Sequence, residues 1–108
     1  MSTIRLLPSD IDPATIRATI GLVSDTHMGQ RLARLPDSLA EALAGVDLLL
    51  HAGDVGNLAV LDQLSAIAPV IAVQGNDDSA HAKAQLPLQA VIGVGGTRVL
   101  LWHSHHVD

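Results

Sequence analysis

Residues 46–77 read VDLLLHAGDVGNLAVLDQLSAIAPVIAVQGND, and this stretch decides the fold class. An apolar run at 46–50 is followed by leucines and an isoleucine at helical spacing within 56–68, and then by a second apolar run at 70–73. This order predicts a strand, a helix that Pro69 ends, and another strand. Because a helix-length crossover separates the two strands, they should be parallel members of one sheet.

Toward the N-terminus the same alternation continues. Residues 20–23 form a short apolar run that predicts a buried strand, and Pro36 precedes a helical pattern that Gly45 ends. Residues 1–17 are polar and contain two prolines, so we expect an N-terminal extension that offers only a short helical turn. One domain over residues 18–108 follows from the length and from the absence of any linker.

Toward the C-terminus the pattern changes from crossovers to a hairpin. Residues 77–88 look irregular, and residues 89–105 read as two strands around the pair Gly95-Gly96, which is a hairpin signal. The predicted order is therefore βαβαβ followed by a hairpin, an α/β fold whose first three strands are parallel.

Composition excludes several functional classes. The chain has no cysteine, which excludes disulfides, cysteine-ligated zinc, iron–sulfur clusters and thiol nucleophiles. Trp102 is its one aromatic residue, so a stacking platform for single-stranded nucleic acid or carbohydrate is excluded. A net charge of −5 with scattered cations argues against duplex nucleic acid as a partner. No signal peptide or membrane-spanning run is present, so we expect a cytoplasmic protein that does not contact the membrane.

Polar side chains collect where the predicted strands end. In an open parallel sheet the carboxyl ends of the strands form one edge, and ligands bind there. Four polar groups at four strand ends should therefore converge, which is a stronger signal than any one of them. The groups are Asp25-Thr26-His27, Gly53-Asp54, Gly75-Asn76-Asp77 and His103-Ser104-His105.

These residue types suit a metal site. Asp25 and His27 lie two residues apart, so on an extended backbone both side chains point to the same face and could chelate one ion. The Asp54 carboxylate could bridge two cations, and Asn76 and His103 add an amide oxygen and an imidazole. Nitrogen and oxygen ligands without sulfur favour Mn, Fe, Ni, Zn or Mg, and two such ions about 3.5–4 Å apart would clamp an in-line displacement at phosphorus.

Each residue also has a plainer interpretation when taken singly. Asp25 could be a turn or N-cap residue, Asn76 a turn former, and His103 a hydrogen-bonded core histidine. His51 fits a core or supporting hydrogen-bonding role better than metal ligation. The convergence of four groups is what favours a site.

The motifs resemble those of the calcineurin-like metallophosphoesterases, and most closely their small bacterial and archaeal phosphodiesterase branch. The resemblance covers about residues 18–106 and rests on SDTH at 24–27, HAGDV at 51–55 and GNDD at 75–78, followed by His103-x-His105. It implies a metallophosphoesterase-type β-sandwich flanked by helices, of which the pattern above would be the N-terminal portion.

The resemblance also implies roles for individual residues. Asp25 and His27 would bind a first metal ion, Asp54 would bridge both ions, and Asn76 and His103 would bind the second. The implied ions are two divalent cations, with Mn²⁺ preferred and Ni²⁺, Fe²⁺, Zn²⁺ or Mg²⁺ as alternatives. The implied reaction is attack of a metal-bridging hydroxide on a small phosphodiester or nucleotide-like substrate.

Three features qualify the match. Asp77 stands where larger relatives have histidine, and this substitution favours substrates with good leaving groups. The expected catalytic residues are Asp54, Asn76, Asp77 and His105. Ser104 stands where the family has glycine. The family continues to a Gly-His-x-His motif, whereas this sequence ends at Asp108, so we expect the domain to lack its C-terminal part.

Two alternatives to an enzyme stay open. One is a non-catalytic scaffold or binding module with the same fold, as in the retromer scaffold subunit, and the other is an inactive truncated fragment. The retained ligands favour the enzyme. We also expect self-association through an exposed sheet edge, because the hairpin would lack a covering layer over Val91, Val94, Val99, Leu100 and Leu101.

Overall fold

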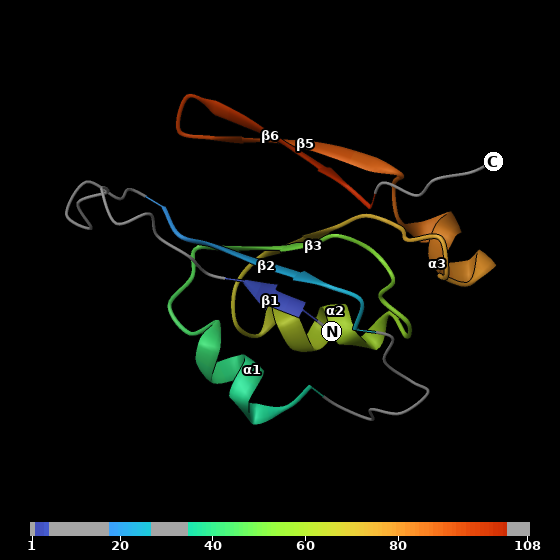
Figure 1. Ribbon diagram of the computed structural model, residues 1–108, viewed down its shortest axis with the longest axis horizontal. Coiled ribbons are helices and arrows are strands. Elements are labelled where there is room, and N and C mark those ends of the chain that lie inside the picture. The colour runs from blue at the N-terminus through green and yellow to red at the C-terminus, as the bar shows by residue number, and fades with distance from the viewer. Residues whose placement is uncertain (1, 5–17, 27–34, 104–108) are drawn as a thin grey trace.

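Three parallel strands form the centre of the structure, as the alternating pattern predicts. The structure is a computed structural model that describes residues 2–4, 18–26 and 35–103. Strands β2 (Ile20–Ser24), β3 (Leu48–His51) and β4 (Val70–Ala72) lie parallel, with β3 in the middle. Their carboxyl ends therefore share one edge of the sheet (Figure 1).

A fourth strand lies where we expected only an extension. Strand β1 (Ser2–Ile4) pairs antiparallel with β2, so the sheet order is β1-β2-β3-β4. Three residues are too few to show the alternation that marks a strand in sequence. The division of the chain at residue 17 stays a prediction.

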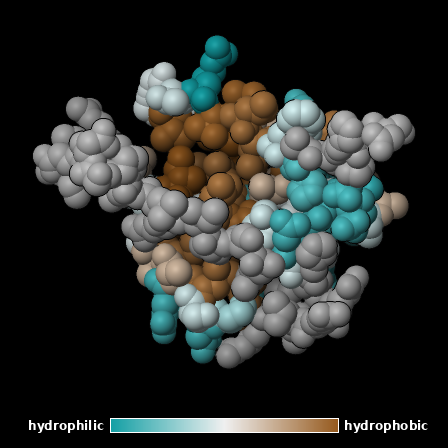
Figure 2. Space-filling model, viewed as in Figure 1, coloured by the Kyte–Doolittle hydropathy of each residue, from teal (hydrophilic) through white to brown (hydrophobic). Residues whose placement is uncertain are grey.

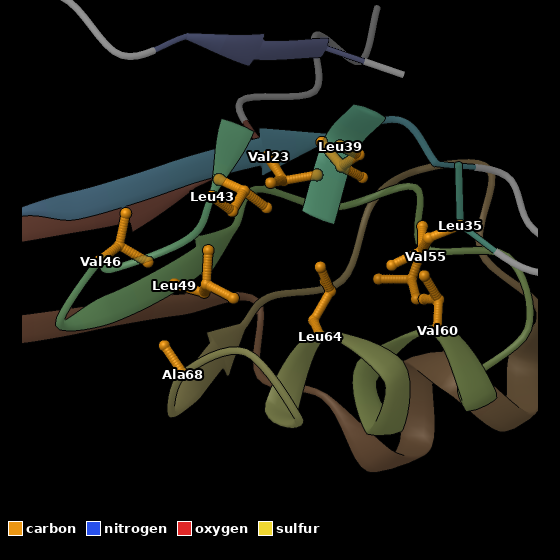
Figure 3. Close-up of a cluster of buried hydrophobic side chains, with 10 residues drawn as sticks. All are labelled: Val23, Leu35, Leu39, Leu43, Val46, Leu49, Val55, Val60, Leu64 and Ala68. Carbon is orange, nitrogen blue, oxygen red and sulfur yellow. The ribbon is translucent and has the colours of Figure 1, made fainter. Parts of the chain in front are cut away.

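Helices α1 (Asp37–Ala42) and α2 (Ala59–Ser65) cover one face of this sheet. They fall within the two segments predicted to be helical. In the parallel strands, alternate side chains such as Val23 and Leu49 point toward the helices and meet Leu43 and Leu64, which are fully buried (Figure 3). Each such leucine contributes about 1.5–3 kcal/mol relative to leaving it exposed.

Strands β5 (Gln89–Val94) and β6 (Thr97–Trp102) form the predicted hairpin, which packs on the opposite face of the sheet. Ile92 and Leu101 of the hairpin meet Leu50 and Val73, so a second core lies between the two sheets. Figure 1 shows the resulting layers of hairpin, sheet and helices. The architecture is the α/β sandwich expected from the sequence.

One expectation about the hairpin is partly wrong. Leu101 is 4% exposed, because it lies on the inward face with its cross-strand partner Ala90, and Val94 and Val99 are partly buried against the same core. Val91 and Leu100 form the next pair and point outward, with 65% and 57% of their surfaces exposed. Leu22 of β2 is also 42% exposed, and Figure 2 shows apolar surface extending beyond the hairpin over the larger sheet.

The expectation that residues 77–88 are irregular is also wrong, because helix α3 (Ala80–Gln85) lies within them. The Ser79 side chain accepts a hydrogen bond from the Ala82 N–H and caps the helix. Three alanines supply the helix propensity, but they stand at alternate positions and the helix has no large apolar side chain, so no helical apolar period can be detected. Among the described helices, none has the length and apolar character needed to cross a bilayer.

Candidate metal centre

Two aspartates in the loops that follow the parallel strands have an unusual backbone conformation. Asp25 follows β2 and Asp54 follows β3, and their φ angles are +57° and +56°. Non-glycine residues rarely adopt this left-handed region, and such strain concentrates at functional sites. The Asp25 N–H donates to the Gly53 carbonyl at 3.0 Å, which joins the two loops.

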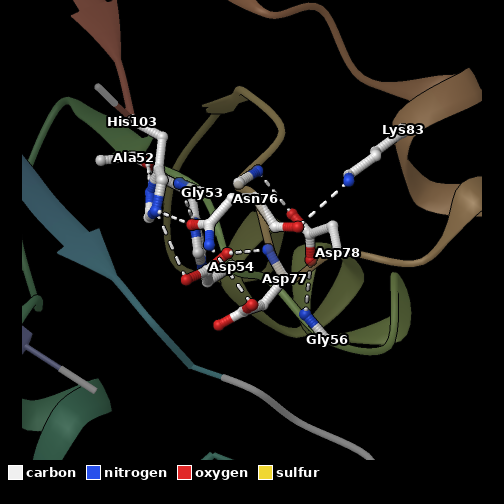
Figure 4. A network of polar contacts seen from close by, with 11 residues as sticks. Ala52, Gly53, Asp54, Gly56, Asn76, Asp77, Asp78, Lys83 and His103 are labelled. Atoms are coloured by element: carbon white, nitrogen blue, oxygen red, sulfur yellow. Dashed lines mark hydrogen bonds and ion pairs between the residues drawn. The ribbon is translucent and has the colours of Figure 1, made fainter. Parts of the chain in front are cut away.

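His103 follows β6 and is oriented by the backbone of the neighbouring sheet. Its Nδ1 lies 2.8 Å from the Ala52 carbonyl oxygen, which can only accept, so Nδ1 carries a proton. Its Nε2 then faces Asn76 Oδ1 at 2.9 Å and Asp54 Oδ2 at 3.4 Å (Figure 4). A histidine that donates one ring N–H to a carbonyl and turns the other nitrogen inward is oriented as metal-binding histidines usually are.

These side chains form a compact ligand set. Ligand atoms of Asp25, Asp54 and His103 all lie within 4.8 Å of one another. Asn76 joins them through its contact with His103, while its Nδ2 donates to Asp77 Oδ1 at 3.3 Å and so keeps Oδ1 turned toward the histidine. We call Asp25, Asp54, Asn76 and His103 the candidate metal centre. Two carboxylates, an imidazole and an amide oxygen suit a divalent ion of the Mn, Fe, Ni or Zn type.

The electrostatics of Asp54 are consistent with a cation site. Burial raises the pKa of the Asp54 carboxyl, and its hydrogen bond with the Asp25 side chain and the charge of Asp77 act in the same direction. The Asp77 N–H, which donates to Asp54 Oδ1 at 3.0 Å, and His103 lower that pKa without fully compensating. A bound cation would stabilise the ionised carboxylate that this environment disfavours.

The structure places most of the predicted residues, but not all. Asp25, Asp54, Asn76 and His103 come together, whereas His27 and His105 lie outside the described residues. Asp77 contacts Asp54 through its backbone N–H, and its own side chain is exposed. The ligand and catalytic roles assigned to all these residues remain predictions.

Asp78 is a residue that the sequence analysis missed. Its carboxylate is 6% exposed and accepts hydrogen bonds from the Gly75 N–H at 2.7 Å and the Gly56 N–H at 3.1 Å. It therefore ties the loop after β4 to the loop after β3, which carry Asn76 and Asp54. The only signal in the sequence is a second aspartate beside Asp77, and that signal does not tell which of the two turns inward.

His51 and Thr26 form a second buried link between loops. The Gly53 N–H donates to His51 Nδ1 at 3.1 Å, so Nε2 of the neutral ring carries the proton and faces Thr26 Oγ1 at 3.0 Å. Thr26 in turn donates to the Val55 carbonyl at 2.7 Å. His51 has no exposed surface, and its two bonds connect the residues next to Asp54 and Asp25 in the chain.

The Asp78→Ala variant is expected to lose roughly 2–4 kcal/mol of unfolding free energy, because it leaves two N–H donors without their charged acceptor. Urea denaturation of Asp78→Ala beside Asp62→Ala, a change at an exposed helix position, measures this. Equal midpoints for the two variants would contradict the bridging role of Asp78.

The sequence is similar to one family model and to two curated proteins of related description. Residues 19–108 match the family model described as the calcineurin-like phosphoesterase superfamily domain. Over 85 residues, 79% of this chain, the sequence is 38% identical to a probable metallophosphoesterase of Methanothermobacter thermautotrophicus and 34% identical to one of Methanocaldococcus jannaschii. The matched part is 49% and 42% of those two proteins, so the chain spans about half the length of the curated relatives it matches.

Solved structures of Vps29 share the fold. A single mutant of Vps29 from Entamoeba histolytica matches with a TM-score of 0.65 and 25% identity, over 82% of this chain and 49% of that one. Vps29 from Chaetomium thermophilum matches with a TM-score of 0.63 and 24% identity, over 75% of this chain and 43% of that one.

Proposed function

The chain belongs to the calcineurin-like phosphoesterase superfamily, and on this premise we propose that it is a metal-dependent phosphodiesterase with a two-metal site. The observation that carries the proposal is the convergence of Asp25, Asp54 and His103, with ligand atoms within 4.8 Å of one another. Asn76 and His27 are proposed as the further ligands, with Asp54 shared between the two ions. Mn²⁺ is the proposed ion.

Divalent ions held there would neutralise charge on a phosphoester and lower the pKa of a water molecule. The residues of this chain supply the geometry. The Ala52 carbonyl fixes the ring of His103, and the Asp77 N–H fixes the Asp54 carboxylate, so neither side chain has to reorganise on binding. The small phosphodiester or nucleotide-like substrate and the cytoplasmic location stay predictions, as does the catalytic role of His105.

Activated diesters are expected to be better substrates than activated monoesters. The exposed carboxylate of Asp77 stands where larger relatives have a histidine, so this position adds negative charge, which repels the dianionic phosphate of a monoester more than the monoanionic phosphate of a diester. With Mn²⁺ added to metal-free protein, we expect bis-p-nitrophenyl phosphate to be hydrolysed at least about tenfold faster than p-nitrophenyl phosphate.

The control for that assay is Asp77→His. If Asp77 sets the preference, this variant should gain monoester activity relative to diester activity while still requiring Mn²⁺. A wild-type chain that prefers the monoester, or an activity that does not depend on added metal, would contradict the phosphodiesterase proposal.

A scaffold or binding role is the second candidate function. The exposed apolar side chains of Leu22, Val91 and Leu100 favour it, because surfaces of this kind commonly mark sites of association. Self-association through the hairpin is the specific form that we propose.

Light scattering should therefore show a concentration-dependent mass above that of a monomer. Introducing charge in the paired outward positions, as Val91→Lys with Leu100→Lys, should return the chain to a monomer. Thr97→Lys, an exposed position in the same hairpin, is the control. A wild-type chain that stays monomeric at all concentrations would rule out this association.

A further inference from the structure

A small cavity opens directly beside the candidate metal centre. Its volume is about 150 Å³, and two of its walls, Asn76 and His103, belong to the centre itself. A group esterified to a phosphate held at the centre would therefore extend into this space. The main lining residues are Gln74, Asn76, Lys83, Leu88, Trp102 and His103.

The volume limits what the cavity can hold. A cavity of about 150 Å³ in another protein binds benzene, whereas pockets for drug-sized ligands measure about 300–1,000 Å³. The cavity therefore encloses one aromatic ring, and the remainder of a larger substituent such as a nucleoside would lie outside it in solvent.

The outer wall is apolar although it adjoins a polar centre. Leu88 and Trp102 are 60% and 45% exposed, and they are brought together because Gln89, the residue after Leu88, pairs with Trp102 across the hairpin. Trp102 is the one aromatic residue in the chain. It offers a single flat surface, which suits one planar ring rather than a row of bases.

The opposite wall carries a positive charge. Lys83 of α3 donates from Nζ to the backbone carbonyl of Asn76 at 3.0 Å, which holds its ammonium group beside this residue of the centre (Figure 4). Gln74 donates to the carbonyls of Lys83 and Leu86 and so anchors the helix that carries the lysine. An ammonium group has three N–H donors, so Lys83 can contact a phosphate oxygen while keeping this bond.

We propose that this cavity is the subsite for one ester substituent of the substrate, that it takes a single planar aromatic ring against Trp102 and Leu88, and that Lys83 contacts the phosphate. The substrate class is therefore a phosphodiester with one small aryl or single-ring substituent. This inference rests on the proposed phosphodiesterase function.

The single tryptophan makes the subsite directly observable. With no tyrosine in the chain, emission excited near 295 nm reports Trp102 alone. Titration with phenylphosphonate should change this emission saturably, and methylphosphonate should bind about three- to tenfold more weakly. Leu88→Ala should weaken phenylphosphonate binding by about threefold or more, whereas Thr97→Ala, at an exposed position of β6 outside the cavity, should leave it unchanged.

Lys83 has its own signature in the same titration. Lys83→Met should weaken the binding of phenylphosphonate and of methylphosphonate by a similar factor, because it removes a contact to the phosphonate group that both share. Lys83→Arg should restore part of this affinity. Arg98→Met, an exposed cation on β6, is the charge control.

Measurements of KM distinguish the aromatic subsite from the proposed phosphodiesterase function. The KM of phenyl p-nitrophenyl phosphate should be lower than that of methyl p-nitrophenyl phosphate, and Trp102→Ala should abolish the difference. Equal binding of the two phosphonates with normal Mn²⁺-dependent hydrolysis would overturn the subsite and leave the function standing. Selective binding of phenylphosphonate by a chain that hydrolyses no phosphoester would support the subsite and overturn the function.

Discussion

Asp54→Asn is expected to lower Mn²⁺-dependent phosphodiester hydrolysis by about a thousandfold or more. The asparagine keeps the size of the side chain and an oxygen to accept the Asp77 N–H, but it removes the negative charge. Charge stabilisation by bound ions is worth several kcal/mol at the transition state, and about 4 kcal/mol corresponds to a factor of a thousand. Initial rates with bis-p-nitrophenyl phosphate measure the effect.

The control must separate lost chemistry from lost folding. Burial raises the pKa of Asp54, so the neutral asparagine should fold at least as well as the wild type in the absence of metal. Asp62→Asn, an exposed aspartate on α2, should leave the rate unchanged and lower the stability by no more than about 1 kcal/mol, because it removes one negative charge from the first turn of the helix. A folded Asp54→Asn variant whose rate stays within a factor of five or so of wild type would show that this carboxylate does not hold the ions.

The second large effect is expected from Gly75→Ala. A Cβ on residue 75 would overlap the carboxylate and the backbone nitrogen of Asp54, which are not the flexible end of a long side chain. The loops after β3 and β4 would have to separate, which would also disturb the hydrogen bond that joins them, from the Gly56 N–H to Asp78. We expect about 3 kcal/mol or more of lost stability, with loss of metal-dependent activity.

Gly93→Ala is the matched control, because a Cβ at this position in β5 meets nothing within 4 Å. Urea denaturation and activity assays on both variants make the comparison. If the two alanine variants were equally stable and active, the close approach of the loop containing Gly75 to Asp54 would be incorrect.

The features of the fold that follow from the spacing of apolar residues were predictable from the sequence. The apolar runs of β2, β3 and β4 and the crossovers between them specify parallel strands, and parallel strands place Asp25, Asp54 and Asn76 at one edge. The hairpin followed from its glycine pair.

The features that could not be predicted are segments without an apolar period and side-chain orientations that depend on tertiary packing. Strand β1 has only three residues, and helix α3 has alanines at alternate positions and no large apolar side chain, so neither shows an apolar period. The burial of Leu101 rather than Leu100 is set by the register of the hairpin against the sheet, and the inward turn of Asp78 rather than Asp77 is set by the backbone of one turn. The cavity beside the candidate metal centre needed α3 and the hairpin to be placed together, which no local pattern encodes.

The most direct test of the candidate metal centre is calorimetric titration of the metal-free chain with Mn²⁺, run in parallel on wild type and Asp54→Asn. The Asp54 carboxylate lies within 4.8 Å of the ligand atoms of Asp25 and His103. Removing its negative charge should therefore abolish metal binding at the whole site and not merely weaken one contact. We predict saturable Mn²⁺ binding to the wild type and no detectable binding to Asp54→Asn under the same conditions. Equal binding isotherms for the two proteins, or no binding to a folded wild-type chain, would contradict the assignment.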